Sequence, residues 1–119
     1  MIRAAAAMVL LIATTSTSVG QDADSANYVM PGCRSYVEGR DPSTISEAHR
    51  QGVCGGMVRV VSGLLPCRPD GVTGGQAVRI VVKYIDANPA RLHEAFAVLA
   101  FEAMSKAWPC PKPSPQQLR

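Results

Sequence analysis

The sequence predicts an all-α fold, a small bundle of about four helices stapled by two disulfides. Apolar residues recur at helical spacing between residues 73 and 107, and capping residues precede these runs. Four cysteines follow an apolar leader, an even number that suits a small exported domain. The chain has 119 residues, of which 18% are charged, so it has the size of one domain and is not a disordered polyelectrolyte.

Residues 1–20 have the pattern of a cleaved signal peptide. Arg3 supplies a positive start, residues 4–13 are all apolar, and the Ser-Val-Gly tripeptide at 18–20 has small residues where a signal peptidase reads. The apolar run is half of the ~20 residues that span a bilayer. We expect cleavage before Gln21, export to the periplasm, and one domain over residues 21–119 without an integral membrane segment. The alternatives are a cut after Ala23 or Ala26, or an uncleaved amphipathic anchor.

All the cysteines lie beyond the leader: Cys33, Cys54, Cys67 and Cys110. In a small exported domain this pattern predicts two disulfides. A zinc site usually has a close pair such as C-x-x-C, which the sequence lacks, so we expect no metal ion and no other cofactor.

The best-defined helix begins after Thr73 and ends at Asn88-Pro89, because the residue before a proline avoids helical geometry. Thr73 is the expected N-cap, and Gln76 three residues later completes a capping box. An apolar stripe follows, formed by Val78, Val81, Val82 and Ile85. The many β-branched residues also allow a strand, but strict alternation is absent.

A second long helix is expected from Pro89 or Ala90 to Trp108-Pro109. Its apolar positions are Leu92, Phe96, Leu99, Ala103 and Ala107. The short link predicts that the two helices fold back as an antiparallel hairpin, which returns Cys110 toward Cys67.

Two further helices are expected upstream. A short amphipathic segment covers residues 28–38, is interrupted by Pro31-Gly32 and ends near Gly39. A longer helix covers residues 45–65, with Ser43 or Thr44 as cap and Glu47 in the first turn. Its glycines weaken the interior and allow a break near Gly52. The apolar residues near its end are interpreted as part of the core, with a dimer face as the alternative: Val60, Val61, Leu64 and Leu65.

Helix geometry removes one of the three disulfide pairings. A helix between Cys54 and Cys67 would separate them by roughly 15 Å, whereas a disulfide needs Cα atoms within ~7 Å. Antiparallel packing of the two upstream helices favours Cys33 with Cys54, which leaves Cys67 with Cys110. The pairing of Cys33 with Cys67 and of Cys54 with Cys110 stays open.

Several function classes lack support in the sequence. The net charge is only +3 and the arginines are scattered, so no nucleic-acid partner is expected. No G-x-S-x-G, H-E-x-x-H or phosphate-loop motif occurs, and paired cysteines leave no thiolate nucleophile. We therefore expect a protein that is not an enzyme.

The run from Cys67 to Pro89 carries a distinctive motif. It begins Cys-Arg-Pro-Asp-Gly-Val-Thr-Gly-Gly-Gln at residues 67–76, and it is flanked by Gly52-x-Cys54-x-Gly56 and by Trp108-Pro109-Cys110. Together these residues resemble the Rap/Tai family of type VI secretion amidase immunity proteins. The resemblance implies a small exported helical protein, often a homodimer, that binds and blocks a peptidoglycan amidase toxin delivered into the periplasm.

The implied mechanism is occlusion of the amidase cleft by a rigid helical surface or loop. The resemblance transfers no inhibitory residue, so candidates rest on exposed polar groups at helix ends. They are Arg68 and Asp70 in the loop at 68–71, and Asp86, Asn88 and Arg91 in the turn at 86–91.

Two other functions remain open. One is a stand-alone periplasmic helper that resembles the small helical Hde acid-stress chaperones in its role, although only two histidines could respond near neutral pH. A structural envelope protein without a cognate toxin is the other alternative. An adjacent reading frame that encodes an amidase would favour immunity.

Overall fold

The computed structural model describes residues 23–117, so the expected signal peptide at 1–20 lies outside the described residues. Within them the chain forms four α-helices and one 3₁₀ turn, and the only β pairing is an isolated bridge between Ser25 and Ala95. The elements are α2 (Ala26–Val37), α3 (Ile45–Gly63), α4 (Gly74–Asp86), η1 (Pro89–Arg91) and α5 (Phe96–Ala107). The expected all-α bundle is confirmed, and the strand alternative for residues 73–85 is wrong.

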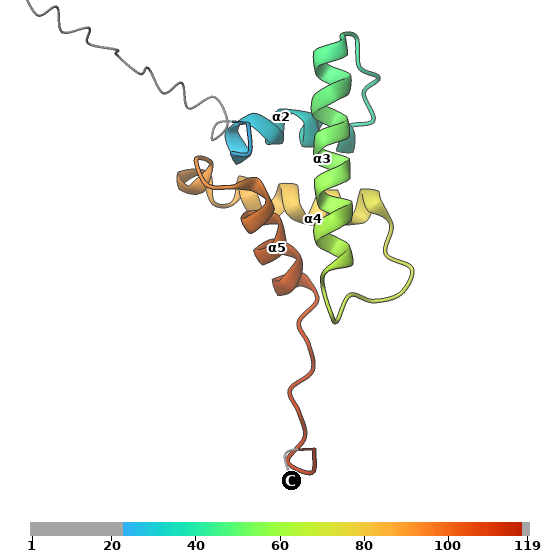
Figure 1. Cartoon of the computed structure of the whole chain (residues 1–119), viewed down its shortest axis with the longest axis vertical. Coiled ribbons are helices and arrows are strands. Elements are labelled where there is room, and N and C mark those ends of the chain that lie inside the picture. The colour runs from blue at the N-terminus through green and yellow to red at the C-terminus, as the bar shows by residue number, and fades with distance from the viewer. Residues whose placement is uncertain (1–22, 118–119) are drawn as a thin grey trace, which may run out of the picture.

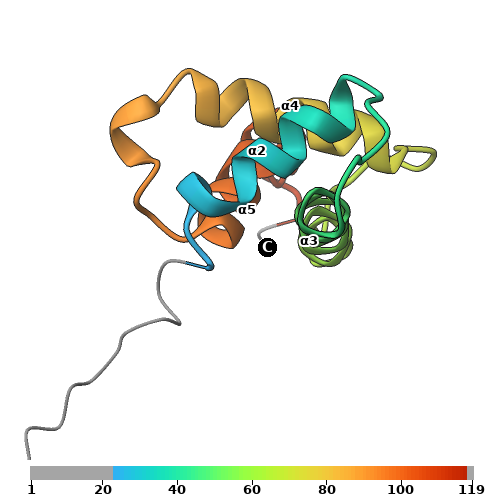
Figure 2. The ribbon, with the colours of Figure 1, turned by 90° about the horizontal axis from the view of Figure 1, so that it is seen from above.

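The four helices pack around one core. In both views α2 and α4 run side by side in opposite directions, while α3 lies across them and is seen nearly end-on in Figure 2. The helix α5 turns back from the end of α4 and packs against α4 and α3 (Figure 1). The largest fully buried side chains come from all four helices: Val29, Met30, Val58, Val78, Val81, Ile85, Phe96, Leu99 and Met104.

The apolar residues near the end of α3 divide between core and surface. Val61 and Leu65 are buried as expected, but Val60 and Leu64 are 66% and 69% exposed, so their assignment to the core is wrong. Helical spacing explains Val60, because Val58 and Val61 lie on the core face of α3 and Val60 lies on another, while Leu64 is the C-cap beyond the helix.

The first helix is continuous, which corrects the expected interruption at Pro31-Gly32. Pro31 removes one helical hydrogen bond, and burial of neighbours such as Met30 and Cys33 on the core face offsets that loss. Gly32 lies so close to α3 that a Cβ there would overlap the Arg50 carbonyl. The helix ends at Val37, and Gly39, just beyond the C-cap Glu38, has a φ of 65° that suits a residue without a side chain.

The helix α3 begins after Thr44, whose Oγ1 accepts from the N–H of Glu47 at 3.1 Å. It runs without interruption to Gly63, so the break near Gly52 does not occur. A Cβ at Gly52 would meet nothing within 4 Å, so this glycine serves no close contact.

The second long helix begins at Phe96 instead of Pro89 or Ala90, and residues 87–95 form a connection longer than expected. Tertiary hydrogen bonds explain the late start. The N–H groups of Ala26 and Asn27, at the start of α2, donate to the carbonyls of Glu94 and Leu92 at 3.0 and 2.8 Å. These two carbonyls accept hydrogen bonds from the start of α2, so they are not available for the hydrogen bonds of a helix through residues 92–94.

Both expected disulfides are confirmed. Cys33 pairs with Cys54 and Cys67 pairs with Cys110, at Cα–Cα distances of 5.3 and 5.1 Å, so the alternative pairing is wrong. The packing assumed for the first pair was antiparallel, whereas α2 and α3 cross steeply (Figure 2). The first bridge is fully buried where α2 and α3 cross, and the second joins the loop after α3 to the exposed segment after α5.

Candidate functional site

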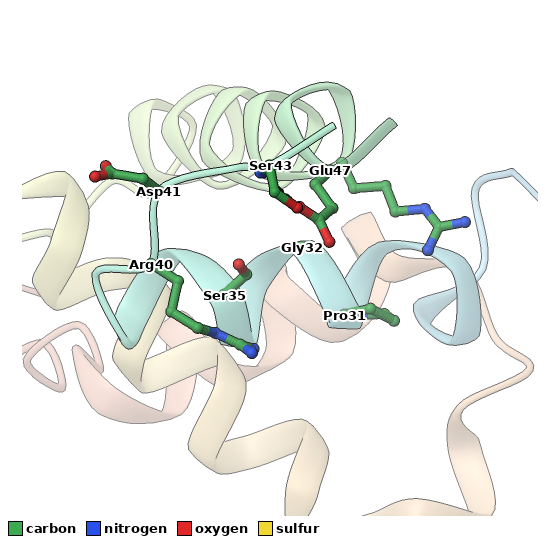
Figure 3. A pocket seen from close by; sticks show the side chains of 8 residues that line it. Pro31, Gly32, Ser35, Arg40, Asp41, Ser43 and Glu47 are labelled. Atoms are coloured by element: carbon green, nitrogen blue, oxygen red, sulfur yellow. Dashed lines mark hydrogen bonds between the residues drawn. The ribbon is translucent and has the colours of Figure 1, made fainter. Parts of the chain in front are cut away.

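A first hollow lies between α2, the loop at 38–44 and the start of α3, with a volume of about 320 Å³. Figure 3 shows the side chains of Ser43 and Glu47 meeting in it, where Glu47 Oε2 accepts from the Ser43 N–H and from its Oγ, both at 2.7 Å. These bonds lower the pKa of Glu47, the bond from the hydroxyl first. Gln51 Nε2 donates to Ser35 Oγ at 2.8 Å and to the Arg40 carbonyl at 2.9 Å. These polar groups thus serve the start of α3 and its junction with α2.

A second hollow lies between the last turn of α2, the middle of α3, the loop at 64–73 and the first turn of α4. We call it the arginine cleft; its volume is about 600 Å³. It is lined by Tyr36, Gly55, Gly56, Arg59, Ser62, Arg68, Val72, Thr73, Gly74 and Ala77. Its size is within the usual range of ligand pockets, ~300–1,000 Å³.

Local interactions fix the walls of the arginine cleft. Thr73 is the N-cap of α4, and its Oγ1 accepts from the N–H of Gln76 at 3.1 Å. Arg68 Nη1 donates to Ser62 Oγ at 3.1 Å, which ties the loop to α3. Cys67 fixes the same loop to Cys110, and Gly71 turns the chain with a φ of 79°. The loop is therefore held at several points and is preorganised for contact.

The arginine cleft is positively charged. The Arg59 side chain makes no ion pair or hydrogen bond with any residue in 23–117, and the one side-chain hydrogen bond of Arg68 is to the neutral Ser62. No carboxylate is among the residues that line the cleft. The two guanidinium groups therefore keep most of their hydrogen-bonding capacity for an anionic group.

The sequence matches the family of Rap1a immunity proteins over residues 10–110. The chain belongs to this family. It is therefore an immunity-family protein, of a class that acts on an effector by binding and is generally non-enzymatic. The matched range includes both disulfides and the whole arginine cleft. No curated protein and no solved structure matches the chain.

The five predicted contact residues of this immunity-family protein fall at opposite ends of α4. Arg68 lines the arginine cleft, and Asp70 is exposed in the same loop without lining it. At the other end, Asp86 Oδ1 pairs with Arg34 Nη2 at 2.7 Å, and Asn88 Nδ2 donates to the Tyr84 carbonyl at 2.8 Å. Arg91 is also engaged there, in a network of its own.

The Arg91 network joins the turn after α4 to α5. The guanidinium donates to both carboxylate oxygens of Glu94 and of Glu102, with the shortest bond, to Glu102, at 2.6 Å. The Tyr84 hydroxyl donates to Glu102 at 2.9 Å and accepts from Arg91. Arg91 and then Tyr84 hold the pKa of Glu102 at about 2, and Arg91 also lowers the pKa of Glu94, while the carboxylates raise the pKa of Arg91. Arg91 is thus a structural residue in the free protein.

Sequence reasoning missed Tyr36 and Arg59 in the arginine cleft and Glu102 in the Arg91 network. The three-residue spacing of Arg91 and Glu94 could have suggested their pairing. Nothing in the sequence signals that Tyr36 and Arg59 share a cleft, because they come from different helices that meet only in the folded chain.

An apolar patch lies on the surface where α3 meets α5. We define it by Leu64, Val98 and Phe101, which are 69%, 51% and 45% exposed and line a shallow hollow together. Within residues 23–117 no group of histidines, cysteines and carboxylates could hold a metal ion. None of the described helices is both long and apolar enough to span a bilayer.

Proposed function

We propose that this chain is a periplasmic immunity protein that binds and occludes a peptidoglycan amidase effector delivered by a type VI secretion system. Family membership over residues 10–110 carries the proposal. The producing cell is protected because the immunity protein covers the amidase cleft before the amidase reaches the cell wall.

Export to the periplasm is supported by two kinds of observation. Residues 1–20 have a positive start, an apolar run and small residues before Gln21. The two disulfides require an oxidising compartment to persist. N-terminal sequencing of the exported protein is expected to begin at Gln21, and a retained Met1 would contradict export by cleavage.

Occlusion requires a surface that loses little entropy on binding. The loop at 68–71 is suited to it, because Cys67, the Arg68–Ser62 bond and the Thr73 cap hold it in place. Arg68 and Asp70 are therefore the contact residues we propose first. Asp86, Asn88 and Arg91 are second, since each would have to exchange or share an intramolecular partner.

We also propose a homodimer through the apolar patch. Glu102 at its edge is already paired with Arg91, so a second copy could bury Leu64, Val98 and Phe101 without stranding that carboxylate. Analytical ultracentrifugation should give a dimer for the wild type and a monomer for Val98→Glu. A monomeric wild type would contradict the dimer and leave the immunity proposal intact.

Contact-dependent competition on solid medium tests immunity directly. A strain deleted for this gene is grown against its otherwise identical parent, which kills by cell contact. We expect the deletion strain to be lysed, rescued by the full gene, and not rescued by residues 21–119 expressed without the leader. Equal competition while the parent's secretion is active would contradict immunity and favour the chaperone or envelope alternatives.

A further inference from the structure

The arginines in residues 23–117 divide into two groups. Four of the seven have a charged or aromatic partner inside the fold. They are Arg34 with Asp86, Arg40 with Glu38, Arg91 with Glu94 and Glu102, and Arg50 over the Tyr28 ring. The other three, Arg59, Arg68 and Arg79, have no carboxylate partner among the described residues.

Two of these three arginines share one cleft. Arg59 and Arg68 line the arginine cleft. Arg79 Nη1 lies beside the first turn of α4, 3.4 Å from where a Cβ of Gly75 would be, and Gly75 follows the lining residue Gly74. Like charges gathered without internal counter-charge make a positive potential that attracts anions. Two guanidinium groups without an internal carboxylate therefore lie at one concave surface.

The shape of the arginine cleft suits a polypeptide segment. Three glycines line the cleft, and a Cβ at Gly56 would meet nothing within 4 Å, whereas a Cβ at Gly55 or Gly74 would contact Tyr36. Tyr36 and Val72 add partly exposed apolar groups that can pack against neighbouring side chains of a bound segment. A bilayer surface is too broad to enter such a recess, whereas a projecting loop can.

We propose that the arginine cleft receives an acidic segment of the effector, with an Asp or Glu carboxylate bound between Arg59 and Arg68. Guanidinium groups bind carboxylates through paired, charge-assisted hydrogen bonds, and Arg68 and Arg59 have donors left to form them. This inference rests on the proposed function, because the effector is the partner. It adds Arg59 and Tyr36 to the contact surface and assigns the chemistry of what binds there.

The genetic test compares two charge-matched variants of the full gene in the competition assay. Arg59→Glu with Arg68→Glu reverses the charge of the cleft, and we expect survival to fall to that of the deletion strain. The control, Lys83→Glu with Lys112→Glu, makes the same change in net charge on exposed residues that do not line the cleft, and it should protect fully. Immunoblots of the periplasmic fraction must show equal amounts of both.

A second variant blocks the cleft sterically without a change in charge. Gly56→Leu places a side chain into the cleft at a helical position where a Cβ meets nothing within 4 Å, so folding is retained. We expect loss of protection. If the deletion strain is lysed and wild type rescues it, yet the double reversal and Gly56→Leu both rescue fully, the cleft inference is wrong and immunity stands. If the deletion strain is never lysed, immunity itself is wrong.

A binding experiment tests the chemistry without the effector. The exported protein, labelled with ¹⁵N and purified from the periplasm, is titrated with an acetylated hexaglutamate peptide and with a hexaglutamine control. We expect amide shifts at Gly55, Gly56 and Gly74 with the acidic peptide only, at least tenfold weaker binding for the double reversal, and weakening by salt. Absence of shifts at these glycines would overturn the assignment.

The same titration is repeated with other anions as alternative ligands. Inorganic phosphate that gives the same shifts with equal affinity would identify a general anion site and overturn the assignment to an acidic segment. Vesicles containing phosphatidylglycerol that retain wild type but not the double reversal would favour a lipid surface and also overturn it. Binding of the peptide alone supports the proposal.

Discussion

Cationic side chains stand near both ends of α4, and the fold uses them in opposite ways. At the C-terminal end, the Arg91 guanidinium is enclosed by Glu94, Glu102 and Tyr84. At the N-terminal end, Arg59 and Arg68 have no carboxylate within the described residues. Exposure and charge alone therefore do not mark a binding residue. A cation whose donors are satisfied inside the fold stabilises it, whereas one without a counter-charge is available to a partner.

The glycine at the α2–α3 crossing and the glycine in the arginine cleft also differ, because the first is tightly packed and the second is open. Substitution at the crossing is expected to have the largest effect on stability. Gly32→Ala forces a Cβ against the Arg50 carbonyl at the α2–α3 crossing, so we expect a loss of roughly 1–3 kcal/mol in unfolding free energy. Gly56→Ala, on the open cleft, should instead gain ~0.5–1 kcal/mol because alanine favours the helix. Urea denaturation measures both. Equal effects of the two substitutions would show that α2 and α3 are less closely packed at Gly32.

Removing each kind of arginine tests the comparison directly. Arg91→Ala leaves Glu94 and Glu102 close together without their shared cation, so we expect a clear fall in Tm. Arg59→Ala removes no internal partner and should change stability by less than about 0.5 kcal/mol. Differential scanning calorimetry compares the two. A fall in Tm for Arg59→Ala as large as that for Arg91→Ala would contradict the distinction between structural and available arginines.

The Thr73 side chain stabilises the N-terminal end of α4, which borders the arginine cleft. Thr73→Ala removes the acceptor of the Gln76 N–H, and we expect a loss of ~1 kcal/mol in urea denaturation. Thr73→Ser keeps the hydroxyl and serves as the control. If alanine and serine behave alike, the cap does not stabilise the helix start that borders the cleft.

Lowering the pH tests the Arg91 network, at the C-terminal end of α4, without a mutation. Arg91 and Tyr84 hold the pKa of Glu102 at about 2, below its ordinary 4.5, and Arg91 lowers that of Glu94. A carboxyl with a lowered pKa in the folded state adds stability that is fully present above pH 4.5 and is lost as the pH falls toward 2. We expect the Tm of the wild type to fall over this window and that of Arg91→Ala to fall less steeply. Parallel pH profiles would contradict the network's role.

The sequence predicts well what is decided locally. The stripe of α4 and its cap at Thr73 depend on neighbours within a few residues, and the structure has both. The start of α5 depends on carbonyls that bond to α2, far away in the chain, so periodicity placed it too early. The disulfide pairs were predicted correctly although the helix crossing was not, because a bridge needs only one close approach.

The candidate site was only partly predictable for the same reason. Arg68 belongs to a loop that the sequence marks with proline, glycine and a following cap. Arg59 looks like any solvated helix residue, and its relevance appears only when three separate elements meet around it. Arg91 was a reasonable contact candidate from exposure at a turn, and only the distant Glu102 shows that its charge is already used.

The pairing between the start of α2 and the start of α5 limits where the proposed leader could be cleaved. The Phe96 N–H donates to the Asp24 carbonyl at 2.8 Å, and the Ala26 N–H donates to Glu94 at 3.0 Å. A leader peptidase that cut after Ala26 would remove the Asp24 acceptor, the Ala26 donor and the Ser25 cap together. A cut before Gln21 or after Ala23 keeps all three. Under the proposed export, processing and folding are linked, since only a mature end at or before Asp24 leaves the two helix starts joined.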